Sequence, residues 1–144
     1  MSTRAIYTFK GFGETYHIYK HHDGYPSGAA RWLGNALAYA WELPRYEPDD
    51  FAAAFVAGNK SLGGGGVRTA KSRTQACDVE FGYTVYPLEY NKQSDYPQLN
   101  VGELIVEVAA TNYWDSKKEK LIWKGPLTAF INNAARIEEE YYAR

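Results

Sequence analysis

The three histidines of the chain all lie between residues 17 and 28, in the stretch His-Ile-Tyr-Lys-His-His-Asp-Gly-Tyr-Pro-Ser-Gly. Imidazole, carboxylate, ammonium and phenol groups at such a spacing can hold a metal ion, exchange protons or bind an anion. The alternating residues before Asp23 predict a strand, and Pro26 and Ser27 predict a helix start. Polar side chains gathered where a strand meets a helix are typical of functional sites.

A metal site is the first use of this stretch to consider. His17 and His21 share one face of the predicted strand, but their Cα atoms would stand roughly 13 Å apart at the usual rise per residue. His21, His22 and Asp23 are adjacent in the chain, which is an unusual arrangement for metal ligands. We therefore expect no metal and no other cofactor.

Acid–base or nucleophilic catalysis is the second use. His21 or His22 beside Asp23 could form an oriented imidazole–carboxylate pair, with Ser27 or Tyr25 as a nucleophile. The chain has no Gly-x-Ser-x-Gly motif, and Cys77 falls on the expected buried face of a strand. We assign no catalytic residue, and a small hydrolase with a His/Asp pair remains one alternative.

Anion binding is the use that these residues favour. Backbone N–H groups at a helix start hold phosphate readily, and the aromatic rings of the stretch can stack on a base. The predicted ligand is small and anionic or nucleotide-like. The predicted ligand-binding residues are Lys20, His21, His22, Asp23, Tyr25, Ser27 and Arg31, and the predicted second shell is His17, Asp78 and Glu80.

A purely structural interpretation accounts for part of the same stretch. Asp23-Gly24 would form the turn, Pro26 and Ser27 would start the helix, and Gly28 would let the helix approach the sheet closely. This interpretation leaves His21 and His22 without a role.

Bulk composition narrows the class of protein. A chain of 144 residues with 45% hydrophobic and 23% charged residues fits one globular domain, residues 1–144. With a formal net charge of −1 the chain as a whole does not attract a phosphate backbone, so we expect no nucleic-acid partner. The single cysteine excludes an internal disulfide, and no apolar run is long enough for a membrane span, so we expect a cytoplasmic protein with no membrane partner.

The hydrophobic pattern predicts an α+β fold, in which an antiparallel sheet of about five strands carries three helices packed mainly on one face. The expected elements are an N-terminal hairpin at 4–22, helices at about 27–43 and 48–59, a Gly-rich loop at 61–66, sheet at about 76–124 and a C-terminal helix at about 126–143. Pro44 is expected to stop the first helix.

The N-terminal third resembles a widespread set of small phage and prophage proteins. The resemblance is carried by Ser-Thr-Arg-Ala at 2–5 and by Tyr-Lys-His-His-Asp-Gly-Tyr-Pro-Ser-Gly at 19–28, and more loosely by Asp-Val-Glu-Phe-Gly-Tyr at 78–83. That family has no settled activity, so the resemblance implies a setting, a mobile element inside a bacterial cell, and no residue roles.

This setting shapes the functional hypothesis. The chain is expected to be a phage-encoded accessory protein that antagonises host defence by sequestering a small nucleotide-derived anionic signal, with a homo-oligomer left open. The alternative is a protein–protein inhibitor that uses the tyrosine-rich surface to block a bacterial defence complex.

Overall fold

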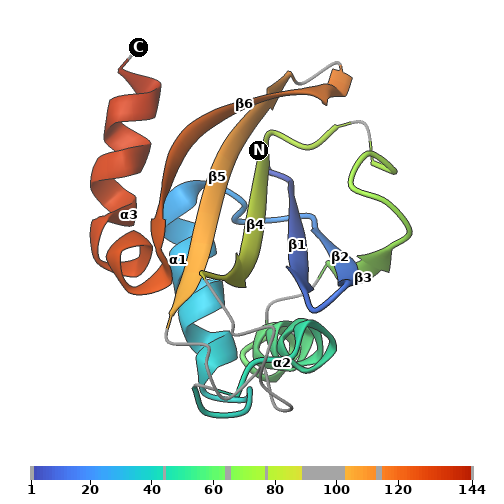
Figure 1. Cartoon of the computed structure of the whole chain (residues 1–144). Coiled ribbons are helices and arrows are strands. Elements are labelled where there is room, and N and C mark those ends of the chain that lie inside the picture. Colours follow the sequence, from blue (N-terminus) through green and yellow to red (C-terminus); the bar gives the residue numbers. More distant parts are fainter. Residues whose placement is uncertain are drawn as a thin grey trace.

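A computed structural model describes residues 2–43, 45–63, 66–76, 78–88, 103–112 and 115–143, with the side chains of 112 and 115–117 excepted. Six strands form one sheet in the order β3-β2-β1-β4-β5-β6, and three helices accompany it (Figure 1). The strands are β1 Ala5–Gly11, β2 Glu14–Lys20, β3 Val67–Ala70, β4 Phe81–Pro87, β5 Leu104–Asn112 and β6 Asp115–Pro126. The helices are α1 Pro26–Leu37, α2 Pro48–Ser61 and α3 Leu127–Tyr142.

The α+β class and the three helices are confirmed, but the expectation of an antiparallel sheet of about five strands was wrong in two respects. The sheet is mixed, because β1 and β4 run parallel at its centre, with Tyr7 opposite Tyr83. It also has one more strand, β3, which pairs antiparallel with β2. β3 escapes prediction because its four residues are too few to show an alternating pattern.

The main core lies between one face of the sheet and all three helices. Tyr7 and Phe9 of β1 point to this side and contact the ring of Phe55 on α2, while Tyr83 of β4 contacts Phe130 on α3. Alternate residues of each strand thus enter the core, as the period of two requires. The predicted placement of the helices on one face agrees with this packing.

The first helix is shorter than the sequence pattern predicted. α1 ends at Leu37 rather than near 43, although apolar residues continue beyond it. Tyr39, Trp41 and Leu43 are 51%, 41% and 46% exposed, so the apolar residues that follow α1 add little to the core. Pro44, the expected stop signal, lies outside the described residues.

The opposite face of the sheet, here called the open face, is crossed by the connection from β3 to β4. Val79 in this connection packs on Ile6 and Tyr19, with Ala70 and Ala76 beside them. The sequence pattern predicted sheet from about residue 76, with the alternation of a two-faced strand. Instead β4 begins at Phe81, and Val79 and Phe81 pack on opposite sides of the sheet. Cys77 lies outside the described residues.

Arg73 fastens this connection to the open face. Its Nη1 donates a hydrogen bond to Oγ1 of Thr8 on β1 at 2.6 Å, and its Nε lies 2.7 Å from Oε1 of Glu119 on β6. The guanidinium crosses directly above Gly82, where a Cβ would stand 2.5 Å from Nη2. One side chain therefore ties together strands that lie three positions apart in the sheet.

Gly28 in the first turn of α1 sets how closely the helix can approach the preceding turn. A Cβ at this position would overlap the backbone carbonyl of Asp23, and Asp23 itself holds a left-handed φ of 58°. Backbone atoms cannot swing aside as a flexible side chain can, so any side chain here displaces the helix start.

We expect Gly28→Ala to lower the free energy of unfolding by about 2 kcal/mol or more, as overpacking against backbone does. The matched control is Gly34→Ala in the same helix, where the nearest atom to a Cβ is Cδ1 of Ile131 at 3.9 Å. That change should raise stability by up to about 1 kcal/mol through helix propensity. Urea denaturation of both variants measures the difference, and equal effects would contradict this packing.

Candidate functional site

The pleat of β2 divides the histidine-rich stretch between two sides of the sheet. Residues 18 and 20 pair with core-facing Tyr7 and Ala5, whereas residues 17 and 19 pair with Thr8 and Ile6 on the open face. His17, Tyr19 and the following His21 therefore belong to the open face, and Lys20 belongs to the helix side.

His21 forms the centre of a polar cluster where β2 leaves the sheet. Its Nδ1 accepts a hydrogen bond from Nε of Arg4 at 3.2 Å and lies 2.9 Å from the hydroxyl of Tyr19. An Nδ1 that accepts leaves the ring proton on Nε2, so the imidazole is neutral in this arrangement. Burial, then the nearby Arg4 and His22, lower the pKa of His21.

Arg4 and His22 extend this cluster. Nη1 of Arg4 forms an ion pair with Oδ2 of Asp78 at 3.0 Å. The ring of His22 stands edge-on to His21, with 4.6 Å between centroids, and its Nδ1 lies 2.9 Å from Oγ of Ser2. The predicted second-shell residue Asp78 thus reaches the histidines through Arg4.

A pocket of about 440 Å³ lies beside the cluster, and we call it the corner pocket. Its lining residues are Tyr19, Arg68, Thr69, Ala70, Gln75 and Ala76. The guanidinium of Arg68 lies 4.9 Å from the centroid of the Tyr19 ring, a cation–π contact. Within the described part of the chain, no carboxylate comes within 4.0 Å of Arg68, so its charge is available to an anion.

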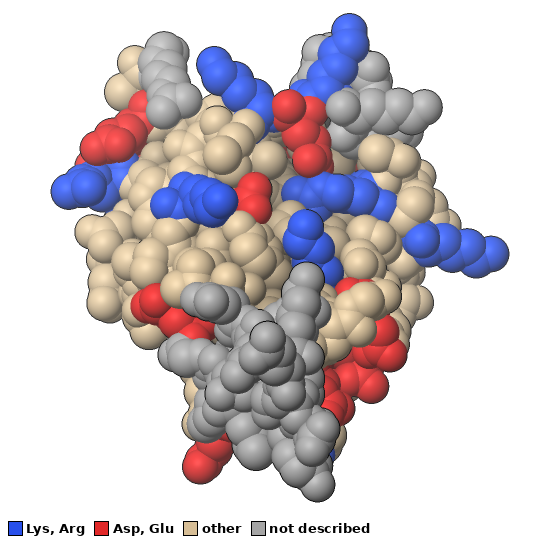
Figure 2. All heavy atoms as spheres, viewed as in Figure 1, with Lys and Arg blue, Asp and Glu red and all other residues tan. Residues whose placement is uncertain are grey.

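Positive charge is common on this side of the molecule. Figure 2 shows Lys and Arg side chains spread in a band across the open face, with a few acidic side chains among them. The corner pocket belongs to this same face, because Arg68 pairs with Tyr19 and Tyr19 pairs with Ile6 on the open face.

Lys20, a predicted ligand residue, points away from the corner pocket. Its side chain is only 1% exposed, and its Nζ donates a hydrogen bond to Oδ1 of Asn59 at 2.7 Å. The ammonium also lies 4.4 Å from the ring of Trp32. Burial lowers the pKa of Lys20, which Asp23 partly offsets. This residue serves the packing between β2, α1 and α2.

The start of α1 already holds a carboxylate of the chain itself. The backbone N–H and the hydroxyl of Ser27 both donate to Oε1 of Glu138 on α3, at 3.0 and 2.9 Å. We had expected a bound anion at these groups. Glu138 supplies the negative charge that the positive end of a helix favours, and it joins α1 to α3.

The other predicted ligand residues lie around this helix start. The hydroxyl of Tyr25 donates to Oδ1 of Asp23 at 3.1 Å, and Arg31 stacks 5.0 Å from the Trp32 ring. Neither His21 nor His22 pairs with Asp23. The imidazole–carboxylate pair required by the hydrolase alternative is therefore not formed.

His17 and Glu80 take separate positions. Nδ1 of His17 lies 2.9 Å from Oγ1 of Thr8, and burial, then Arg73, lower its pKa. Burial, then the Glu80 carboxylate, raise the pKa of Tyr142, which places Glu80 near α3. Of the predicted second shell, only Asp78 thus joins the His21 cluster.

Sequence reasoning missed three residues of the site: Arg4, Arg68 and Gln75. Arg68 lies on the unpredicted strand β3, and Gln75 lies in the connection that follows it. Arg4 precedes β1 by one residue, and continuing the alternation of Ala5 and Tyr7 directs it to the open face opposite His21, so this signal could have found it.

Comparison of the chain with protein-family models, with curated proteins and with solved structures found no match. Within the described ranges, no His, Cys, Asp and Glu side chains form a group of three or more that could hold a metal ion. No described helix has the length and apolar character needed to cross a membrane.

Glu138→Ala is expected to lower the free energy of unfolding by about 1 to 3 kcal/mol, because two donors at the start of α1 lose a charged acceptor. The control is Glu139→Ala, which removes an exposed carboxylate from the same helix and should change stability little. Thermal or urea unfolding provides the comparison. Equal stability of the two variants would show that Glu138 does not cap α1.

Proposed function

We propose that this chain is a binding protein whose corner pocket captures a small anionic ligand of the nucleotide class. We further propose that it acts inside a bacterial cell as a phage-encoded antagonist of host defence, by sequestering such a ligand as a signal. No catalytic step is part of this proposal.

The observation that carries the ligand class is the charge around the pocket. Arg68 lines it without a carboxylate partner among the described residues, and Arg4 with the two histidines stands next to it. Planar guanidinium groups suit phosphate oxygens because they donate paired hydrogen bonds. The neighbouring Asp78 neutralises only one of the two arginines.

Two further features support a nucleotide-like ligand over a bare ion. The volume of about 440 Å³ is in the range of small-molecule sites. The amide NH2 of Gln75, whose Oε1 accepts a hydrogen bond from the N–H of Lys71, is a donor that a base or a sugar could meet.

The setting in host defence rests on a different observation. The resemblance of residues 19–28 to small phage and prophage proteins supports action inside an infected bacterium. A protein that only has to hold a signal needs a pocket and no catalytic machinery.

The test is isothermal titration of the chain with a panel of cyclic nucleotides and ADP-ribose derivatives. We expect one class to bind, and Arg68→Ala to weaken that binding about tenfold or more through loss of a charge-assisted hydrogen bond. The control is Arg136→Ala, which removes an exposed arginine on α3 and should leave binding unchanged. Intact ligand recovered after denaturation is expected, since no turnover is proposed.

Absence of binding across the panel would contradict the proposal. So would binding that is insensitive to Arg68→Ala but abolished by Tyr25→Ala, because that result would move the ligand to the start of α1. Recovery of a cleaved ligand would favour the hydrolase alternative.

A further inference from the structure

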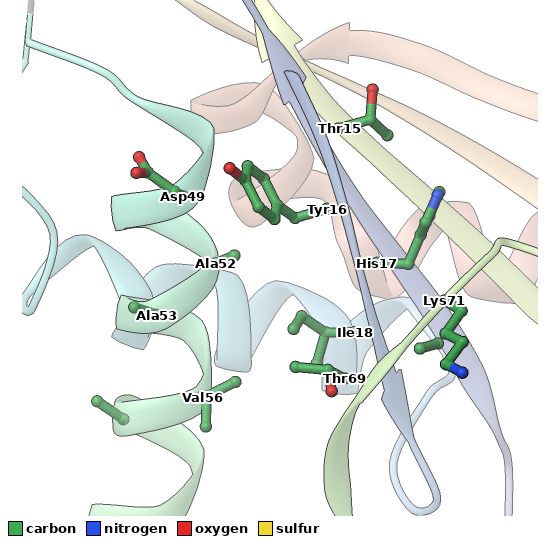
Figure 3. Close-up of a pocket in the computed structure, with 12 residues that line it drawn as sticks. Thr15, Tyr16, His17, Ile18, Asp49, Ala52, Ala53, Val56, Thr69 and Lys71 are labelled. Carbon is green, nitrogen blue, oxygen red and sulfur yellow. The ribbon is translucent and has the colours of Figure 1, made fainter.

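A second cavity, of about 520 Å³, opens between α2 and the β2–β3 edge of the sheet, on the side away from the corner pocket (Figure 3). We call it the edge groove. Ile18 and Ala52 lie at its base, and Tyr16 points across it toward Asp49 in the close-up. Ala53, Val56, Ala57 and Thr69 also line it.

Helix α2, beside the edge groove, has apolar residues on the face that packs in the core and also on the face along the groove. Residues 51–58 of α2 form an uninterrupted run of Phe, Ala, Val and Gly. Phe51 and Phe55 are buried in the main core, whereas Ala53 and Ala57 are exposed along the groove. A helix that is apolar on all sides is normally covered on all sides.

The strand that lines the edge groove has an open edge at the same place. β3 pairs with His17–Lys20 only, so the first part of β2 has no strand partner on this side among the described residues. The N–H of His21 donates to Gly66 on this side, and alternation along the strand directs the main-chain groups of Thr15 the same way. Lys71, the residue after β3, donates its N–H to the side chain of Gln75 instead.

Acidic groups mark the hairpin end of the edge groove. Burial, then the carboxylates of Glu14 and Asp49, raise the pKa of the Tyr16 hydroxyl, so both carboxylates stand around this ring. Neither carboxylate has a cationic side chain within 4.0 Å in the described residues. An occupant that pairs with β2 here meets these carboxylates at the hairpin end, whereas the cation of the groove, Lys71, follows the end of β3.

The carboxylates of Glu14 and Asp49 distinguish a second copy of this chain from a segment of another protein as the occupant of the groove. A second copy docked around a two-fold axis near Thr15 would bring Glu14 and Asp49 of both copies together, because such an interface pairs one patch with itself. Like charges placed across an interface oppose association. A segment that carries its own lysine or arginine meets no such repulsion.

We propose that the edge groove binds an extended segment of a partner protein, which adds a strand to β2, places alternate apolar side chains against α2 and sets a basic residue beside Glu14 and Asp49. This mode of recognition combines main-chain pairing with side-chain pockets. It is independent of the proposed anion site, which lies on the open face.

The probe for this proposal is a display library of random heptapeptides, selected on the immobilised full chain. We expect enriched peptides to share apolar residues at alternate positions and a lysine or arginine at one end. Ala53→Arg should weaken an enriched peptide at least tenfold, because the new side chain enters the groove. Ala135→Arg, an exposed alanine in α3, is the matched control and should bind as the unchanged chain does.

Peptides that bind the Ala53→Arg chain as tightly as the unchanged chain would overturn the proposal, as would failure to enrich any sequence. Enriched peptides with apolar residues at helical spacing would contradict binding as an added strand. Analytical ultracentrifugation tests whether a second copy occupies the groove. If the unchanged chain is a dimer and the Ala53→Arg chain is a monomer, the groove serves self-association and the proposal is overturned. Ala57→Arg repeats the test if Ala53→Arg lowers the unfolding midpoint.

Discussion

The alternation of side chains along β2 is the constraint on which the rest of the account depends. A strand cannot direct consecutive side chains to the same side of a sheet, so Lys20 and His21 must separate. Lys20 enters the interior between β2, α1 and α2, where Asn59 and Trp32 receive its ammonium. His21 remains on the open face with Arg4. One short segment therefore supplies both a buried structural cation and the centre of a polar site.

Residues that are distant in sequence contact both ends of the histidine-rich stretch and determine which groups remain accessible there. Glu138, separated from Ser27 by 111 positions, fills the anion position at the start of α1. Arg73 holds the β3–β4 connection across the open face, so that Gln75 and Ala76 form one wall of the corner pocket. Because Glu138 already occupies the helix start, the corner pocket is the site that we propose for an external anion.

Local sequence patterns predicted the parts of the fold that local physics determines. The hairpin, the helix starts at Pro26 and Pro48 and the helical core on one face follow from alternation, proline and apolar periodicity. The parallel pairing of β1 with β4 and the position of Arg68 depend on strand order, which no short pattern contains. Lys20 shares its strand face with Ile18, yet its charge led us to predict a ligand contact. Its burial becomes intelligible only once Asn59 and Trp32 are in place.

The most direct test of this account is a map of where an anionic nucleotide derivative touches the chain, by following backbone amide chemical shifts while ADP-ribose is added. The account predicts the largest changes at Tyr19, His21, Arg68 and Gln75, with Ser27 and Gly28 nearly unaffected because Glu138 occupies their side of α1. Changes centred on Ser27 and Gly28, or no changes at the corner pocket, would contradict it.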